Sequence, residues 1–152
     1  MGRYAYRETD IFHFHNANPK CRNASDCVAR AISVALSQDW ETTIRELTEL
    51  GIKRGLVFNE PKCYDAYLES KGWQKMKEPR DKNNKKIRVA QYLKTPGAKG
   101  GVILAHVGSH HLTVIVDGVV WDTWDCSLQT MHTYYTNPNA KGPKKEKRRF
   151  TL

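Results

Sequence analysis

The sequence has no run of about 18 consecutive apolar residues, the length that a membrane-spanning helix requires. It also lacks an apolar stretch after its first residues, MGRYAYRETD, so we expect no secretory signal peptide. Only four cysteines are present, and their irregular spacing does not suit the disulfide scaffold of a small secreted domain. These absences predict a cytoplasmic protein that keeps free thiols and has no membrane partner.

Acidic residues are scarce relative to basic ones, with 16 Asp and Glu against 25 Lys and Arg and a net charge of +9. A positive net charge favours an anionic partner, such as nucleic acid or an acidic protein. The basic residues gather in segments 77–88 and 141–149, and neither segment contains interleaved aromatic residues or a nucleic-acid-binding motif. We therefore favour a solvated loop and a solvated tail, and keep nucleic-acid binding as an alternative.

The chain contains no internal repeat and no long linker, and 152 residues suffice for one domain with a hydrophobic core. We predict a single domain over residues 1–152. Its first part, residues 1–24, is rich in Asn, His and aromatic residues without a clear period, which predicts an irregular segment. A basic tail is predicted from about residue 137 to residue 152.

Apolar residues recur at helical spacing after Cys27, at Val28, Ala31, Ile32, Ala35 and Leu36. This pattern, together with residues typical of helix ends, predicts three helices, over residues 27–36, 40–50 and 60–71. The expected N-caps are Ser25 or Asp26, Asp39 and Asn59, and the expected helix-ending glycines are Gly51 and Gly72.

The second half of the chain carries β-branched runs bounded by turn residues, which are typical of strands. Residues 101–107 predict a buried strand, and residues 111–125 predict two strands joined at Asp117-Gly118, a pair typical of a type I′ turn. Residues 73–77 suit a short strand, whereas residues 87–94 suit either a helix or a strand. This order indicates an α+β fold, with N-terminal helices packed on one side of a C-terminal antiparallel β-sheet.

A two-residue turn at 117–118 fixes the register of this hairpin, and side chains along each strand alternate between the two faces of the sheet. His111, Asp122 and Trp124 then share one face, while His110 points to the other. His111 and Asp122 are diagonal neighbours, about 7–8 Å apart along the backbone and within side-chain reach. The opposite face is predicted to be the core face, with Leu112, Val114, Val116, Val119 and Trp121.

An imidazole beside a carboxylate is the pair that a general base requires, because the carboxylate fixes the tautomer and stabilises the charged ring. An exposed hydrogen-bonded pair on a sheet surface would show the same pattern. In the first turn of a helix, the positive helix end favours a thiolate at Cys27, and the backbone N–H of Cys27 can donate to an oxyanion. Cys27, His111 and Asp122 are therefore a candidate nucleophile, base and orienting residue. A small core cysteine is the alternative for Cys27.

Two segments carry a resemblance to a known family. Asp26-Cys27-Val28 with Arg30-Ala31-Ile32 resembles the start of the helix that bears the nucleophile in papain-like cysteine peptidases, and residues 111–125 resemble their His- and Asp-bearing hairpin. The most similar members are small phage and bacterial proteins with this fold. The resemblance implies thioester chemistry on a peptide, isopeptide or related amide bond, catalysed without a cofactor by Cys27, His111 and Asp122. A protein or peptide substrate, including a conjugated modifier, is the implied partner.

The resemblance also implies an oxyanion-hole side chain about six residues before the nucleophile, where such enzymes carry Gln. Here that position is Cys21, so we expect an asparagine to substitute, with Asn23 favoured over Asn18 and Asn16. Trp124 and His110 are predicted to border the substrate cleft, with packing of Trp124 on the first helix as an alternative.

Two other functions fit parts of the same sequence. His13, His15, Cys21 and Cys27 have side chains that suit zinc, although their spacing matches no common zinc finger. Alternation of His and Phe here equally indicates a strand with Phe12 and Phe14 turned inward. A binding module without catalysis would instead use the basic surface against nucleic acid or an acidic protein.

Overall fold

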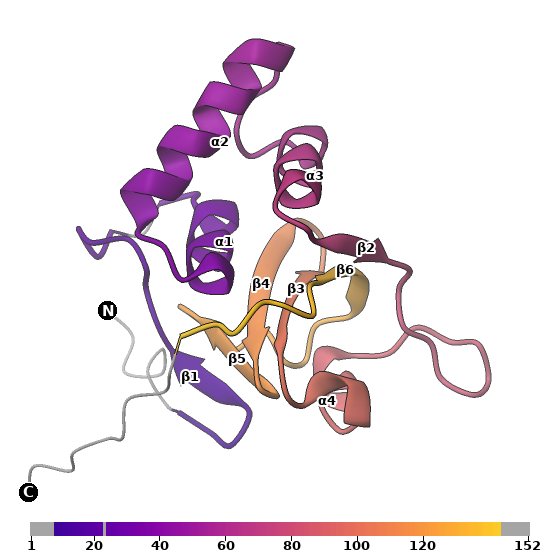
Figure 1. Cartoon of the computed structure of the whole chain (residues 1–152). Coiled ribbons are helices and arrows are strands. Elements are labelled where there is room, and N and C mark those ends of the chain that lie inside the picture. Colours follow the sequence, from indigo (N-terminus) through magenta and orange to yellow (C-terminus); the bar gives the residue numbers. More distant parts are fainter. Residues whose placement is uncertain (1–7, 23, 144–152) are drawn as a thin grey trace, which may run out of the picture.

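The computed structural model describes residues 8–22 and 24–143, and these residues form an α+β structure around a six-stranded mixed sheet (Figure 1). The strand order is β1-β5-β4-β3-β6-β2. The strands are β1 (Phe12–Phe14), β2 (Gln74–Met76), β3 (Val102–Val107), β4 (His111–Val116), β5 (Val119–Asp122) and β6 (Met131–Thr136). The helices are α1 (Cys27–Leu36), α2 (Trp40–Arg54), α3 (Pro61–Ser70), α4 (Val89–Tyr92) and the 3-10 turn η1 (Pro96–Ala98). The α+β class expected from the sequence is thus confirmed.

Helix α1 follows the predicted apolar stripe, with Val28, Ala31, Ile32 and Ala35 all buried. Asp26 occupies the N-cap position, but its side chain does not cap the helix. Its carboxylate is buried and instead accepts hydrogen bonds from the side chains of Asn18, Arg30 and Trp40. Asp26 therefore does not cap the helix as expected, because side chains from other parts of the fold bind its carboxylate instead.

The predicted ends of helices α2 and α3 need two corrections. Helix α2 begins at the expected cap, since Asp39 accepts a hydrogen bond from the backbone of Thr42, but it continues beyond Gly51 to Arg54. Gly55, with φ of 69°, takes the left-handed C-cap. Helix α3 has Glu60 rather than Asn59 at its N-cap position.

Gly51 lies inside α2 because the chain returns directly over it. A Cβ atom at this position would lie 2.3 Å from the backbone oxygen of Leu56, closer than any van der Waals contact. The carbonyl of Gly51 also accepts a hydrogen bond from the backbone N–H of Leu56 at 2.8 Å. The glycine is therefore required by close backbone approach and not by the end of the helix.

Substitution of Gly51 by alanine is expected to lower the free energy of unfolding by about 2 kcal/mol and the Tm by roughly 4–8 °C. Alanine gains about 1 kcal/mol of helix propensity, but overlap with a backbone atom outweighs this gain. Thermal and urea unfolding measure the effect. Gly101→Ala is the matched control, because nothing lies within 4 Å of its added Cβ. Equal stability of the two variants would contradict the close approach.

The hairpin has the predicted register, with Val114 opposite Trp121, Ile115 opposite Val120 and Val116 opposite Val119. Asp117 and Gly118 both have positive φ angles, 50° and 78°, as a type I′ turn requires. The expectation of an antiparallel sheet is only partly correct, because β1 pairs with β5 in parallel. Strand β6, which pairs with β3 and β2, was not expected, since its partners are distant in sequence.

Both faces of the sheet are buried over its centre. Helices α1–α3 and one face of β3–β5 share one apolar cluster, which includes the predicted core residues Leu112, Val114 and Trp121. The other face, which includes Phe12 of β1, packs against α4 and η1, and Ile115 and Val120 on that face are fully buried. The expectation of helices on one side only is therefore wrong for α4, which resolves the ambiguous segment 87–94. None of the helices in the described part of the chain is long and apolar enough to cross a membrane.

Candidate functional site

The predicted triad residues lie at the ends of one helix and two strands, which meet at the start of α1. Cys27 is the first residue of α1, His111 is the first residue of β4 and Asp122 is the last residue of β5. Apolar packing of α1 against β4 and β3 fixes the distance between the helix and the strands. The site therefore depends on contacts between residues that are more than 80 positions apart.

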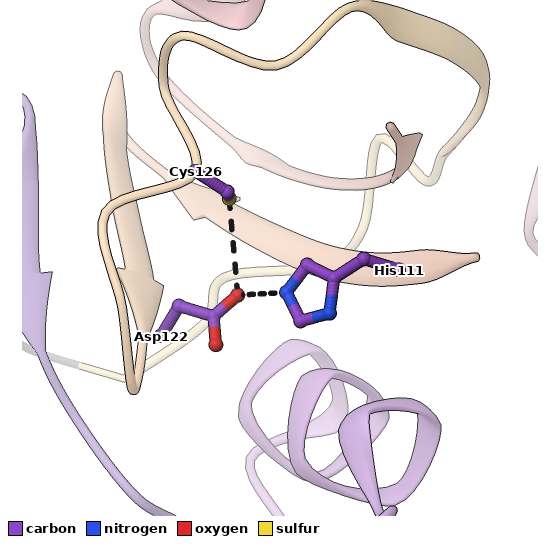
Figure 2. Close-up of side chains that lie close together, drawn as sticks. All are labelled: His111, Asp122 and Cys126. Carbon is purple, nitrogen blue, oxygen red and sulfur yellow. Dashed lines mark hydrogen bonds and ion pairs between the residues drawn. The ribbon is translucent and has the colours of Figure 1, made fainter. Parts of the chain in front are cut away.

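His111 and Asp122 form a direct hydrogen bond, with 2.6 Å between Nε2 of the ring and Oδ2 of the carboxylate (Figure 2). The hydroxyl of Thr113 donates to the same oxygen at 2.6 Å, and the backbone N–H of Thr123 donates to Oδ1 at 2.7 Å. Asp122 is only 5% exposed. These hydrogen bonds fix the orientation of the carboxylate, so that His111 Nε2 faces it and Nδ1 remains for another partner.

Cys27 is half-buried and meets His111 from the helix side. Burial by itself raises the pKa of the Cys27 thiol. A side-chain hydrogen bond with His111, a backbone hydrogen bond from Leu112 and the charges of His111 and Arg30 act in the opposite direction and prevail, so the pKa is lowered overall. The thiolate is the nucleophilic form of cysteine, and this environment favours it.

His111 is shifted in the complementary direction. Burial alone lowers the pKa of its ring, but hydrogen bonds with Asp122, Cys126 and Cys27 and the charge of Asp122 raise the pKa to about 11. The two pKa shifts are complementary, because the charged form of each group favours the charged form of the other.

Arg30 joins the start of α1 to the end of β5. Its guanidinium bonds to the Asp26 carboxylate, and its second terminal nitrogen lies 3.8 Å from Oδ1 of Asp122. Both carboxylates are buried and Arg30 is largely covered, with 11% of the Arg30 side chain, 5% of Asp26 and 4% of Asp122 exposed. Sequence reasoning gave Arg30 no role, although its i+4 spacing from Asp26 signals an ion pair on the helix.

Two other residues around Asp122 were also missed. Thr113 lies directly opposite Asp122 in the register that the hairpin turn predicts, so the register alone was sufficient to identify it. Cys126 is fully buried, and its thiol lies 3.9 Å from Oδ2 of Asp122 (Figure 2). No sequence signal identified Cys126, because the loop after β5 returns to the site only in the folded chain.

A cleft of about 800 Å³ opens beside Cys27 and His111. His110 and Trp124 both line it, as predicted, and the Trp124 ring centroid lies 4.9 Å from that of His111. The start of α3, the β3–β4 turn and strand β6 complete its walls, through Asn59, Tyr64, Gly108 and His132. Cys27 can therefore be reached from this cleft.

The expected oxyanion-hole side chain, Asn23, lies outside the described residues. Asn18 is buried and donates its amide to Asp26, and Asn16 accepts from the backbone of Asn18, so both are engaged in the N-terminal segment. Cys27 is the first residue of α1, so its backbone N–H has no acceptor within the helix. A backbone N–H without a helical acceptor is the kind of donor that an oxyanion requires.

The residues considered for zinc do not come together. The rings of His13 and His15 stack beside Trp121, Cys21 is exposed, and Cys27 faces His111. Among the described residues, the group with metal-ligand spacing is His111, Asp122 and Cys126. The 2.6 Å between His111 and Asp122 is a hydrogen-bond distance, whereas two ligands on tetrahedral zinc lie about 3.3 Å apart. This geometry fits a hydrogen-bonded triad better than a zinc site.

Comparison with known proteins identifies no relative, so a function can be inferred only from the geometry of the site. No family model, curated protein or solved structure matches the chain.

Proposed function

We propose that the protein is a papain-like cysteine peptidase or amidase that cleaves a peptide, isopeptide or related amide bond. The observation that carries this proposal is that Cys27 and His111 line the same cleft while His111 bonds to the buried Asp122 behind it. A thiol at a helix start, an imidazole beside it and a carboxylate behind the imidazole are the parts of a nucleophilic triad. The cleft beside them admits a protein or peptide substrate.

In the proposed first step, the Cys27 thiolate attacks the carbonyl carbon of the amide, and the carbonyl electron pair moves onto oxygen. The Cys27 backbone N–H donates a hydrogen bond to this oxyanion. His111 Nδ1, the ring nitrogen that does not face Asp122, then gives its proton to the amide nitrogen as the carbon–nitrogen bond breaks. A thioester on Cys27 and a free amine result.

In the second step, water attacks the thioester while the neutral His111 ring removes a proton from it. The carbon–sulfur bond breaks, which releases the acid and regenerates the thiolate and the protonated ring. Asp122 keeps Nε2 protonated and stabilises the ring charge throughout. Attack by an amine in place of water would make the same site an acyltransferase.

Hydrolysis of a panel of fluorogenic peptide amides tests the proposal, with acid quenching and mass spectrometry to trap the acyl group on Cys27. Cys27→Ala is expected to abolish both turnover and the trapped adduct. Cys21→Ala is the control and is expected to keep full activity, because Cys21 is exposed and does not line the cleft.

Turnover that survives Cys27→Ala would refute the peptidase proposal. Absence of any adduct, together with salt-dependent binding of nucleic acid that Cys27→Ala leaves unchanged, would instead support a binding module.

A further inference from the structure

Two buried carboxylates flank the nucleophile, and one cation lies between them. Asp26 directly precedes Cys27 in the chain, and Asp122 lies behind His111. Each is about 5% exposed, so each requires a compensating charge or strong hydrogen bonds. Within residues 8–22 and 24–143, Arg30 is the Lys or Arg side chain that forms an ion pair with either of them.

Arg30 reaches both carboxylates through different atoms. One terminal nitrogen bonds to Oδ1 of Asp26 and lies 3.4 Å from the carbonyl of Ala24, and the other approaches Oδ1 of Asp122. The rigid fork of a guanidinium permits such a bridge, whereas the single ammonium of lysine does not. The third nitrogen, Nε, is buried without a hydrogen-bond partner in the described part of the chain. The two carboxylates therefore determine where the guanidinium lies.

Arg30 is also on the same helical turn as the nucleophile. It lies three residues after Cys27 on α1, and its link to Asp122 runs from α1 to the end of β5. Oδ2 of Asp122 is occupied by His111 and Thr113, so Arg30 approaches the opposite side of the same carboxylate. The helix that carries the nucleophile thus also carries the cation that orients the last member of the triad.

We infer that Arg30 is a positioning residue that bridges Asp26 and Asp122 and so aligns Asp122 with His111 and Cys27. The bridge adds a charged link between the start of α1 and the end of β5 to the apolar packing that fixes their distance. It also adds a positive charge beside the thiol, and this charge is one of the causes of the lowered Cys27 pKa. Removal of the Asp26 charge is expected to act in the opposite sense to removal of Arg30, because it leaves the positive charge of Arg30 less compensated beside the thiol.

The inference builds on the proposed triad, but its test needs no substrate. The rate of Cys27 alkylation by iodoacetamide, measured from pH 4 to pH 10, gives the pKa of the thiol whether or not the protein cleaves amides. Arg30→Met is expected to raise that pKa by about one unit and to slow alkylation about 3- to 4-fold at pH 6, since the more basic thiolate is also more reactive. Asp26→Asn is expected to lower the pKa, the opposite sign. Damage to the fold alone would not give opposite shifts.

An NMR measurement distinguishes the positioning effect of the Arg30 guanidinium from the effect of its positive charge. The proton between His111 and Asp122 is observable by NMR as a downfield imidazole N–H signal. Arg30→Lys keeps the charge without the fork, so we expect a thiol pKa close to that of the native protein but a weakened His111–Asp122 signal. Asp26→Asn keeps an oxygen for Arg30 and is expected to preserve the signal.

Arg45→Met is the matched control, because Arg45 also forms an i,i+4 pair, with Glu41 at 2.9 Å, but is 71% exposed. It is expected to leave both readouts unchanged. A native thiol pKa and a native imidazole signal in Arg30→Met would overturn the inference. If Arg30→Met does not fold, the other two variants decide. An unchanged or raised thiol pKa in Asp26→Asn, or a native His111–Asp122 signal in Arg30→Lys, would overturn it equally.

Discussion

Replacement of His111 by glutamine is expected to slow the alkylation of Cys27 about 100-fold at pH 6. A cysteine with an ordinary pKa of about 8.5 is only about 0.3% thiolate at this pH. In the native protein, the hydrogen bond with His111 and the charge of its ring both lower the thiol pKa. Glutamine removes the charge, so that burial again raises the pKa. The lower intrinsic reactivity of a low-pKa thiolate keeps the expected effect below the full ratio of thiolate fractions.

Cys21 provides an internal standard for this measurement, because it is exposed and is alkylated in the same sample. Its rate is expected to be the same in both proteins. His132→Gln is the control variant, since His132 lines the same cleft but bonds to the carbonyl of Gly108 at 2.8 Å. Equal rates at Cys27 in the native protein and in His111→Gln would show that the imidazole does not activate the thiol.

Replacement of Asp122 by asparagine is expected to lower kcat/KM by about 10- to 100-fold and to narrow its pH profile from both sides. A hydrogen bond to a charged partner contributes about 1.5–3 kcal/mol, which sets this range. Asp122 raises the pKa of His111, so its loss lowers the pH at which the ring deprotonates. When a smaller fraction of the His111 ring is protonated, its positive charge stabilises the Cys27 thiolate less. The pKa of the thiol therefore rises. The pH interval in which thiolate and protonated ring coexist must therefore shrink.

Asp117→Asn is the control for this change, because it removes the same charge at the other end of the same hairpin. Asp117 is exposed in the turn, where asparagine tolerates the positive φ and keeps an oxygen for the backbone N–H of Gly100. Its pH profile is expected to be native. A native profile in Asp122→Asn as well would exclude a role for this carboxylate in the triad.

Prediction from the sequence was most successful where local chemistry fixes the structure. The Asp117-Gly118 turn fixed the hairpin register, and the register placed Asp122 within reach of His111. The apolar stripe after Cys27 was sufficient to predict α1 and its last residue, with Ser25 and Asp26 left as alternatives for the N-cap position. These features depend on neighbours in the chain or on one tight turn, so their energetics are visible in the sequence.

Prediction was less successful where a residue serves a distant partner. Gly51 is a residue type typical of a helix end, yet it lies within α2 because the backbone of Leu56 packs directly against it. Asp26 is a residue type typical of an N-cap, yet its carboxylate accepts hydrogen bonds from Asn18, Arg30 and Trp40. The parallel pairing of β1 and the addition of β6 likewise depend on segments far away in the chain.

The sequence by itself thus determined the α+β class, the helix start at Cys27 and the pairing of His111 with Asp122. Only the tertiary structure brought α1 against β4, so that the thiol meets the imidazole. The contacts of Arg30 and of Cys126 with Asp122 likewise form only in the tertiary structure. The reason is physical, because turn geometry and helical period are local properties, whereas packing and buried charge pairing require the whole core to assemble.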